Sequence, residues 1–246
     1  MGFKEVLDAA SGGDPHAQNA MGYMYFEGNG VQKDLEKAFM WFRLSARQGD
    51  AEGQCNMGYM LTHGYGAYQD AEKAFKLYKC SAEQGYVRAQ FNLAHMFSEG
   101  MGTEQDWEEA LRWYTKAAEN GNLAAHYRIG VMKEEGRGIP QDEGEAAKIY
   151  GECAEIGHPK ARFRLGMMTF EGRGMRKDPD KAAKILAKAA EEGSPDAMLQ
   201  LGKMSLSGEG MVKSRSNAEK WFRKAAARGS EEASGILKGL QDSSQG

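Results

Sequence analysis

A glycine recurs every 36 residues along this chain of 246 residues, and this period constrains the fold more than any other feature. The glycines stand at 13, 49, 85, 121, 157, 193 and 229, without an insertion. A fixed period of this length is typical of repeat proteins, in which neighbouring copies stack and bury one another's apolar faces. We therefore expect six repeats over 13–228, and we number the positions of each repeat from zero at its glycine.

Each repeat contains the pattern of two helices separated by a Gly-x-Gly turn at positions 15 and 17. Helix A is expected at about positions 2–14, and helix B begins near position 21. The residues at position 21 suit helix N-caps: Asp34, Asp70, Asp106, Asp142, Asp178 and Ser214. Helix B ends before the next position-zero glycine, which can adopt the positive φ that commonly terminates a helix.

Apolar residues recur on one stripe of each helix, which predicts how the two helices pack. Position 11 is always methionine, and positions 25 and 33 are always alanine. Position 9 is glycine in five repeats and Ala94 in the other. We expect these small residues to let a neighbouring helix approach closely. The methionines, despite resembling a copper-binding row, lie in phase with the core stripe.

The two ends of the chain carry half-repeats. Residues 1–12 resemble a capping helix B, and residues 229–246 a capping helix A that ends in the polar tail QDSSQG. Leu237 and Leu240 occupy core positions of that last helix. These features predict one domain over 1–246, an all-α solenoid rather than two globular domains.

The repeat resembles the Sel-1-like repeat, a relative of the tetratricopeptide repeat. The segments MGYMYFEGNGVQKDLEKAFMWF at 21–42 and LGMMTFEGRGMRKDPDKAA at 165–183 carry most of the motif. The resemblance implies a right-handed α-solenoid (superhelix) that acts as a protein–protein interaction scaffold or adaptor. The cysteine-rich branch of the family has a bonded cysteine pair in each repeat, whereas this chain has three cysteines in all. The activities of that branch are therefore not carried over.

A helical wheel separates the core face of helix A from a second face. In tetratricopeptide-like stacks helix A lines the concave groove, so the resemblance implies that this second face binds a partner. It carries more large apolar groups than a solvated face needs. The candidate groove residues are Tyr23, Phe26, Tyr59, Phe91, His95, Tyr127, Phe163, Met167 and Phe170. The alternative is that packing between adjacent A helices buries several of them.

A polar row runs along the border of the same face. Tetratricopeptide carboxylate clamps use Asn, Lys and Arg at similar places, where Asn holds an extended peptide backbone and cations bind carboxylates. The candidate clamp residues are Asn56, Arg88, Asn92, Arg128, Lys160 and Arg164. The alternative reading of each is a solvated helix edge.

Charge is distributed unevenly along the repeats, although the net charge is only −3. Repeats 2–4 sum to −8 and repeats 5–6 to +8. Such asymmetry can orient a charged partner or drive head-to-tail self-association. The basic half lacks a recognised nucleic-acid motif, so we expect no nucleic-acid partner.

The sequence offers no catalytic constellation, and we expect no enzyme activity, no cofactor and no metal. The five histidines occupy five different repeat positions. Cys55, His63 and His95 are the one arrangement that could approach a metal, but they lack ligand spacing. The carboxylates of Glu134 and Glu135, at the end of an A helix, are expected to be solvated.

The function predicted from sequence is a non-enzymatic scaffold that binds another protein or an extended peptide in its groove. Two alternatives remain open: a bacterial immunity or regulatory protein that inhibits a toxin or signalling protein, and a small-molecule-binding or hydrolytic enzyme. No apolar run is long enough to span a membrane, and no secretory signal is visible. The chain as given is therefore expected in the cytoplasm, or in the periplasm or outside the cell if a leader was removed.

Overall fold

The computed structural model describes residues 2–242, which form fourteen α-helices and no strand. The helices are α1 (Phe3–Ser11), α2 (Pro15–Glu27), α3 (Leu35–Arg47), α4 (Ala51–His63), α5 (Ala71–Glu83), α6 (Val87–Glu99), α7 (Trp107–Glu119), α8 (Leu123–Glu135), α9 (Glu143–Ile156), α10 (Pro159–Glu171), α11 (Pro179–Glu191), α12 (Pro195–Ser207), α13 (Arg215–Ala226) and α14 (Glu231–Asp242). Even numbers are A helices and odd numbers are B helices. The prediction of an all-α solenoid with two helices per repeat is confirmed.

The predicted caps begin the B helices. The Asp34 carboxylate accepts a hydrogen bond from the backbone N–H of Lys37, and its counterparts in the later repeats do the same. The glycines at positions 0, 15 and 17 all have positive φ. At Gly66 a Cβ atom would collide with the carbonyl of Leu35, so glycine is required both by φ and by the close approach of the turn to α3.

Small residues set the distance between paired helices, as predicted. A Cβ atom on Gly22 of α2 would lie 2.5 Å from the ring of Phe42 in α3, and one on Gly166 of α10 would lie 2.7 Å from Leu186 in α11. The alanines at position 25 are fully buried in every repeat. Five of the six position-11 methionines are buried, and Met24 of the first repeat is half-buried. The conserved spacing within the chain therefore builds the core.

Both predicted capping helices are present. Val6 and Ala10 of α1 are buried in one cluster with Met21. Leu237 and Leu240 of α14 pack, half-buried, against the core formed around α12 and α13. Residues 243–246, which include most of the expected polar tail, lie outside the described residues.

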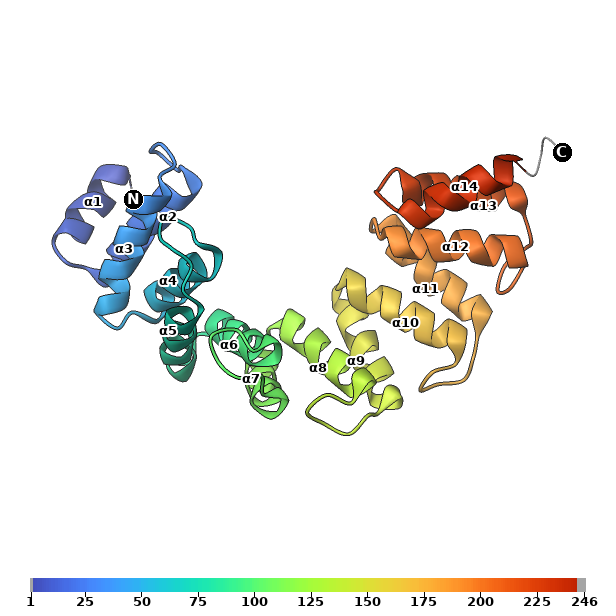
Figure 1. Ribbon diagram of the computed structural model, residues 1–246, viewed down its shortest axis with the longest axis horizontal. Coiled ribbons are helices and arrows are strands. Elements are labelled where there is room, and N and C mark those ends of the chain that lie inside the picture. The colour runs from blue at the N-terminus through green and yellow to red at the C-terminus, as the bar shows by residue number, and fades with distance from the viewer. Residues whose placement is uncertain (1, 243–246) are drawn as a thin grey trace. The chain divides into compact units, whose positions relative to one another are not determined.

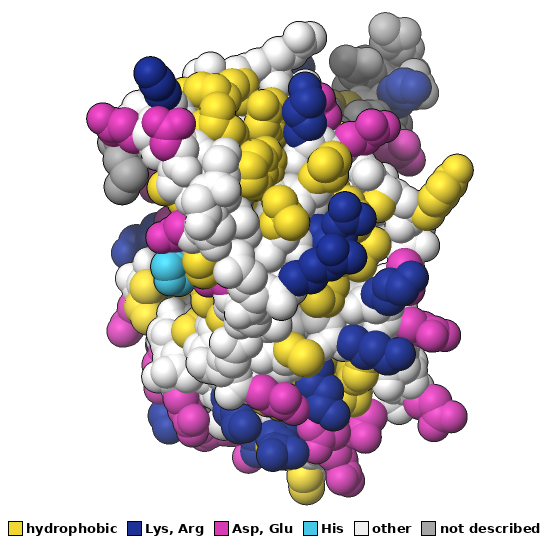
Figure 2. All heavy atoms as spheres, turned by 90° about the vertical axis from the view of Figure 1, so that its left-hand side faces the viewer, with side chains coloured by type: hydrophobic (Ala, Val, Ile, Leu, Met, Phe, Trp, Pro, Cys, Tyr) yellow, Lys and Arg dark blue, Asp and Glu magenta, His cyan; other side chains and the backbone are white. Residues whose placement is uncertain are grey.

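The contacts divide the chain between Ala125 and His126 into two compact units, called the first and the second unit below. Within each unit A and B helices alternate, and each packs on its neighbours in sequence (Figure 1). On the face shown in Figure 2, apolar side chains reach the surface in patches among charged ones. No helix within residues 2–242 has the length and apolar character needed to span a bilayer. The single domain expected over 1–246 stays a prediction.

Candidate functional site

The nine candidate groove residues occupy the surface of the A helices, and none of them is fully buried. Tyr59 is exposed, with 37% of its surface accessible. The other eight are half-buried, because each ring or side chain also packs on a neighbouring helix. The two readings left open by the sequence therefore both describe part of the structure: these residues contact neighbours and still present surface.

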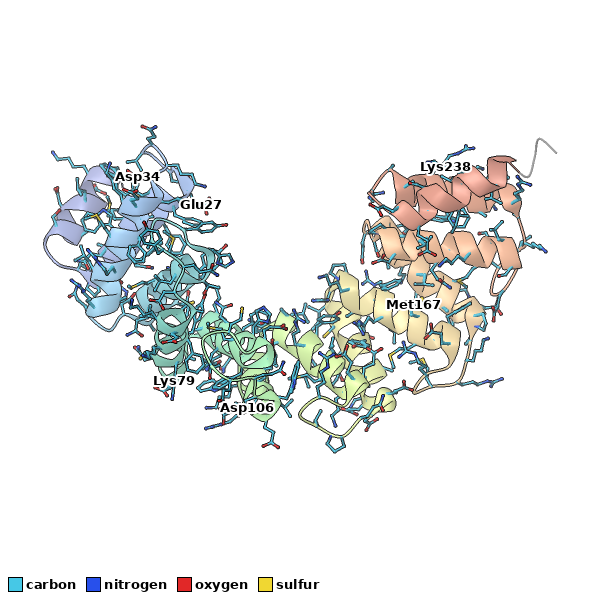
Figure 3. All side chains as sticks on the ribbon, in the orientation of Figure 1. Glu27, Asp34, Lys79, Asp106, Met167 and Lys238 are labelled. Carbon is cyan, nitrogen blue, oxygen red and sulfur yellow. The ribbon has the colours of Figure 1, made fainter. Side chains whose placement is uncertain are left out.

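A pocket of about 270 Å³ opens on this surface in the first unit. It is formed by three successive A helices, α2, α4 and α6, with Phe42 of α3 and Met60 of α4 at its base. Glu27, at the end of α2, stands at its rim (Figure 3). Six of the sequence-predicted residues line this pocket: Tyr23, Phe26, Asn56, Tyr59, Arg88 and Asn92.

Hydrogen bonds fix the polar end of the pocket. The Tyr23 hydroxyl donates to Asn56 Oδ1 at 3.0 Å. Arg88 donates from Nη1 to the Tyr23 hydroxyl oxygen at 3.1 Å, and from Nη2 to Asn56 Oδ1. Asn56 is itself buried, and its Nδ2 donates to Asn19 Oδ1 at 2.8 Å. Asn56 thus positions the Arg88 guanidinium, whereas a direct clamp would need a freer side chain.

The Arg88 guanidinium is a permanent cation held by neutral oxygens. Burial by itself lowers its pKa, but contacts with Cys55 and the Tyr23 hydroxyl outweigh burial and raise the pKa above its usual value. Burial also raises the pKa of the Cys55 thiol, which is therefore protonated at neutral pH. The ion pairs among residues 2–242 include none between Arg88 and a carboxylate within 4.0 Å. The pocket therefore offers an unneutralised, pre-oriented positive charge.

Aromatic rings form the other end of the pocket. Phe26 lies edge-on to Tyr59 with ring centroids 6.2 Å apart, and Tyr65 lies within 6.3 Å of both. His63 stacks on Tyr65 at 5.4 Å and lies 4.2 Å from Tyr59. The Lys33 ammonium lies 5.5 Å from the centre of the Phe26 ring. This cluster gives the pocket an apolar wall suited to a partner's side chain.

Two further groove candidates of the first unit lie outside the pocket on α6. Phe91 packs against Tyr114 of α7 with ring centroids 5.6 Å apart. His95 lies 4.0 Å from the carboxylate of Glu99, one turn along the same helix. Asn92, between them, points its amide toward the Cys55 sulfur at 3.9 Å. The row predicted on α6 therefore has mixed surroundings rather than one shared environment.

The second unit neutralises its central cation internally. Arg164 donates from Nη1 to Glu134 Oε2 at 2.6 Å. Arg173 and the Tyr150 hydroxyl also donate to the Glu134 carboxylate, at 2.8 and 2.6 Å. A partner carboxylate would have to displace Glu134 from Arg164. Arg128 and Lys160, the remaining clamp candidates, are exposed.

The expectation that Glu134 is solvated is wrong. Its residue surface is only 8% exposed, because Tyr150 and two arginines surround the carboxylate. Burial raises the pKa of Glu134, but the hydrogen bonds from Tyr150, Arg173 and Arg164 outweigh it and lower the pKa overall. Position 13 is Phe, Thr, Ser or Leu in the other repeats. An acid at a position that is otherwise apolar or hydroxylic was the available signal.

The groove candidates of the second unit lie along α8 and α10. Tyr127 stacks on His158 with ring centroids 4.5 Å apart and lies 5.7 Å from Tyr150. Phe163, Met167 and Phe170 pack, half-buried, beside the core of this unit, and Met167 is labelled on α10 in Figure 3. These residues form a surface row, but no pocket comparable to that of the first unit brings them together with the clamp residues.

No group of three or more His, Cys, Asp or Glu side chains within residues 2–242 is placed to hold a metal ion. Cys55 is buried, and His63 hydrogen-bonds through Nδ1 to the Tyr59 carbonyl at 2.9 Å. The structure therefore gives no support to the metal arrangement considered from the sequence.

Comparison with known proteins decides the family. The model of the Sel1 repeat matches six consecutive segments: residues 15–50, 51–86, 87–122, 123–158, 159–194 and 195–230. The chain belongs to the Sel1 repeat family. The matched segments have the same 36-residue period as the repeats defined from the sequence and start two residues later. The comparison with curated proteins gives no match.

Solved Sel1 repeat structures share this fold. A protective antigen present in uropathogenic Escherichia coli strains is 30% identical, with a TM-score of 0.85 over 96% of this chain and 51% of its own. A Sel1 repeat protein from Oxalobacter formigenes is 36% identical, with a TM-score of 0.83 over 96% of this chain and 68% of its own. An immunity protein from Pseudomonas aeruginosa is 20% identical with a TM-score of 0.49, too low for any inference.

The chain spans about half the length of the Escherichia coli protein. Sel1 repeats commonly form protein-interaction scaffolds, typically without enzymatic activity.

Proposed function

We propose that this Sel1 repeat protein is a non-enzymatic scaffold whose A-helix surface binds a segment of another protein. The observation that carries the proposal is the pocket of the first unit, which joins an aromatic wall to an oriented cation. A partner side chain would pack between Phe26 and Tyr59, and a partner carboxylate would bind Arg88. Buried aromatic and arginine contacts of this kind commonly dominate the binding energy of an interface.

The half-buried state of the groove residues supports this proposal. A solvated face needs no aromatic rings, and a core would bury them fully. Tyr59 and Tyr65, each 37% exposed, lie between these limits. Their ring contacts hold them in place before a partner arrives, which lowers the entropy lost on binding.

The proposal is tested by photo-crosslinking in cells, with benzoylphenylalanine in place of Tyr59 or of Tyr68. Tyr68 is a matched control because it is also a tyrosine of the first unit and is 97% exposed, but it lies outside the pocket. The proposal expects a discrete crosslinked protein with the probe at 59 and not at 68. Equal crosslinking at both positions, or none at 59, would contradict it. A toxin or signalling protein as the product would identify an immunity or regulatory inhibitor.

Charge segregation favours a second candidate, head-to-tail self-association. The acidic repeats 2–4 and the basic repeats 5–6 differ in sign, and Lys184 of α11 and Lys220 of α13 are exposed. Sedimentation velocity at low and high salt tests this, because screening weakens attraction between exposed charges. A salt-sensitive oligomer that is lost in Lys184→Glu/Lys220→Glu supports self-association, and a monomer at every salt concentration rules it out.

A further inference from the structure

The two helices of a repeat are linked by a side-chain contact between position 5 on helix A and position 35 at the end of helix B. In repeat 1, Gln48 donates from Nε2 to Gln18 Oε1 at 2.8 Å. In repeat 2, Gln84 donates from Nε2 to Gln54 Oε1, also at 2.8 Å. Other residues make the same link in the last two repeats: the ion pair Arg162–Glu192 and the contact of Arg228 with the Met198 sulfur.

Repeat 3 breaks this link. Asn120 stands at position 35, one methylene shorter than the glutamine of repeats 1 and 2. Its Nδ2 donates instead to the carbonyl of Lys116 at 2.8 Å. Gln90, at position 5, donates from Nε2 to the carbonyl of Ala82 at 3.4 Å. Its Oε1 has no hydrogen-bond partner among the described residues, although Gln90 is only 5% exposed.

The unpaired oxygen borders a pocket of about 630 Å³ between α5 and α7, over α6. Lys79, labelled in Figure 3, extends from α5 at its edge. Trp113 lines the pocket, and the Lys116 ammonium lies 4.3 Å from the centre of its ring. This pocket shares no lining residue with the one on the A-helix surface, so it is a separate place on the first unit.

The surroundings indicate what the pocket would bind. A buried acceptor without a partner is costly and accepts an N–H donor readily. Three cations and two carboxylates line the pocket, and Arg112 and Glu109 pair at 3.0 Å, so neither sign of ligand charge is strongly favoured. The two preceding repeats show the group that fits this acceptor, which is the primary amide of a glutamine side chain.

We propose that the α5–α7 pocket is a second interaction site, which binds the primary amide of a glutamine side chain from a partner protein. The partner amide donates to Gln90 Oε1, as Gln48 and Gln84 do to their counterparts, and its aliphatic stem packs beside Trp113. The site exists because Asn120 is too short to fill it.

Two probe peptides test the chemistry: acetyl-Gly-Gln-Gly N-methylamide and the same peptide with Met in place of Gln. They have the same backbone donors and side chains of similar length, but only one has a primary amide. Each is titrated at millimolar concentration into the labelled full chain, with the Trp113 indole and Gln90 side-chain amide signals followed by NMR. We expect saturable shifts with the Gln peptide and an affinity lower by roughly fivefold with the Met peptide, the effect of one hydrogen bond.

Two variants at one position test the site. Asn120→Gln restores the link of repeats 1 and 2, so it should abolish binding of the Gln peptide. Asn120→Ala removes the same native side chain but leaves Gln90 Oε1 unpaired, so it should retain binding. Asn120→Gln should also melt at a higher temperature than Asn120→Ala, which confirms that the link has formed.

Three outcomes overturn the proposal: no saturable shift with the Gln peptide, equal affinity for the two peptides, or binding that survives in Asn120→Gln once its melting temperature has risen. A high-resolution structure with only a water on Gln90 Oε1 at saturating peptide would overturn it as well.

Discussion

Arg164 and Glu134 form an ion pair at 2.6 Å in the second unit, whereas Arg88 in the first unit is held by the neutral oxygens of Tyr23 and Asn56. A groove cation is thus satisfied within the chain in one unit and lacks a carboxylate in the other. This difference assigns Glu134 a role in stability and Arg88 a role in binding.

Glu134→Gln is expected to destabilise the second unit by about 2 kcal/mol, since it weakens hydrogen bonds to a charged, largely buried group. Arg164 and Arg173 would then face a neutral amide. Chemical denaturation at neutral pH, compared with the wild type, measures the loss. An unchanged free energy of unfolding would show that the network contributes no net stability.

The contribution of Glu134 should depend on pH in a defined direction. Its pKa is lowered in the folded state, so the stabilisation is complete at neutral pH, where the carboxylate is charged in both states. It is lost as the pH falls below about 4 toward the folded-state pKa, because the native carboxylate then becomes protonated. Denaturation curves of the wild type and Glu134→Gln should therefore converge in acid. A difference that grows in acid would contradict the assignment.

Neighbouring methionines on α10 should respond differently to truncation. Met168 is fully buried, so Met168→Ala should cost about 2–5 kcal/mol through the cavity it leaves. Met167 is half-buried on the groove face, so Met167→Ala should cost clearly less. Equal losses in thermal denaturation would mean that position 11 is not the core position.

Two helical glycines of the second unit should respond in opposite directions to alanine. A Cβ on Gly166 would lie 2.7 Å from buried Leu186, and such overpacking costs about 1–3 kcal/mol, more than the gain in helix propensity. Nothing lies within 4 Å of a Cβ on Gly151 of α9, so Gly151→Ala should stabilise by roughly 0.5–1 kcal/mol. Melting temperatures of the two variants, which should move apart from the wild type, check the prediction.

The fold could be predicted from the sequence because each repeat encodes its own local structure. Asp34 and its counterparts cap the B helices, and the glycines at three positions of each repeat adopt positive φ, both of which depend on neighbouring residues in the chain. The close packing of Gly22 on Phe42 followed from one small residue recurring at position 9. Six copies in phase made each of these local signals unambiguous.

The candidate site was predicted only in part, since its contacts join residues far apart in the chain. The aromatic and polar rows were located on the correct face, but helical periodicity cannot show that Glu134 meets arginines 30 and 39 residues away. It also cannot show that Asn56 is buried against Asn19. Tyr65 was missed because it lies in a turn, outside the helical pattern that defined the groove.

The most direct test of the central proposal is the affinity of the crosslinked partner for purified variants, measured by calorimetry. Tyr59→Ala and Arg88→Gln should each weaken binding by roughly tenfold or more, as expected for central contacts of an interface. Tyr68→Ala, the exposed control, should bind as the wild type does, and circular dichroism should show all three variants folded. If the folded Tyr59→Ala and Arg88→Gln proteins bind the partner as tightly as the wild type, the first-unit pocket is not its binding site.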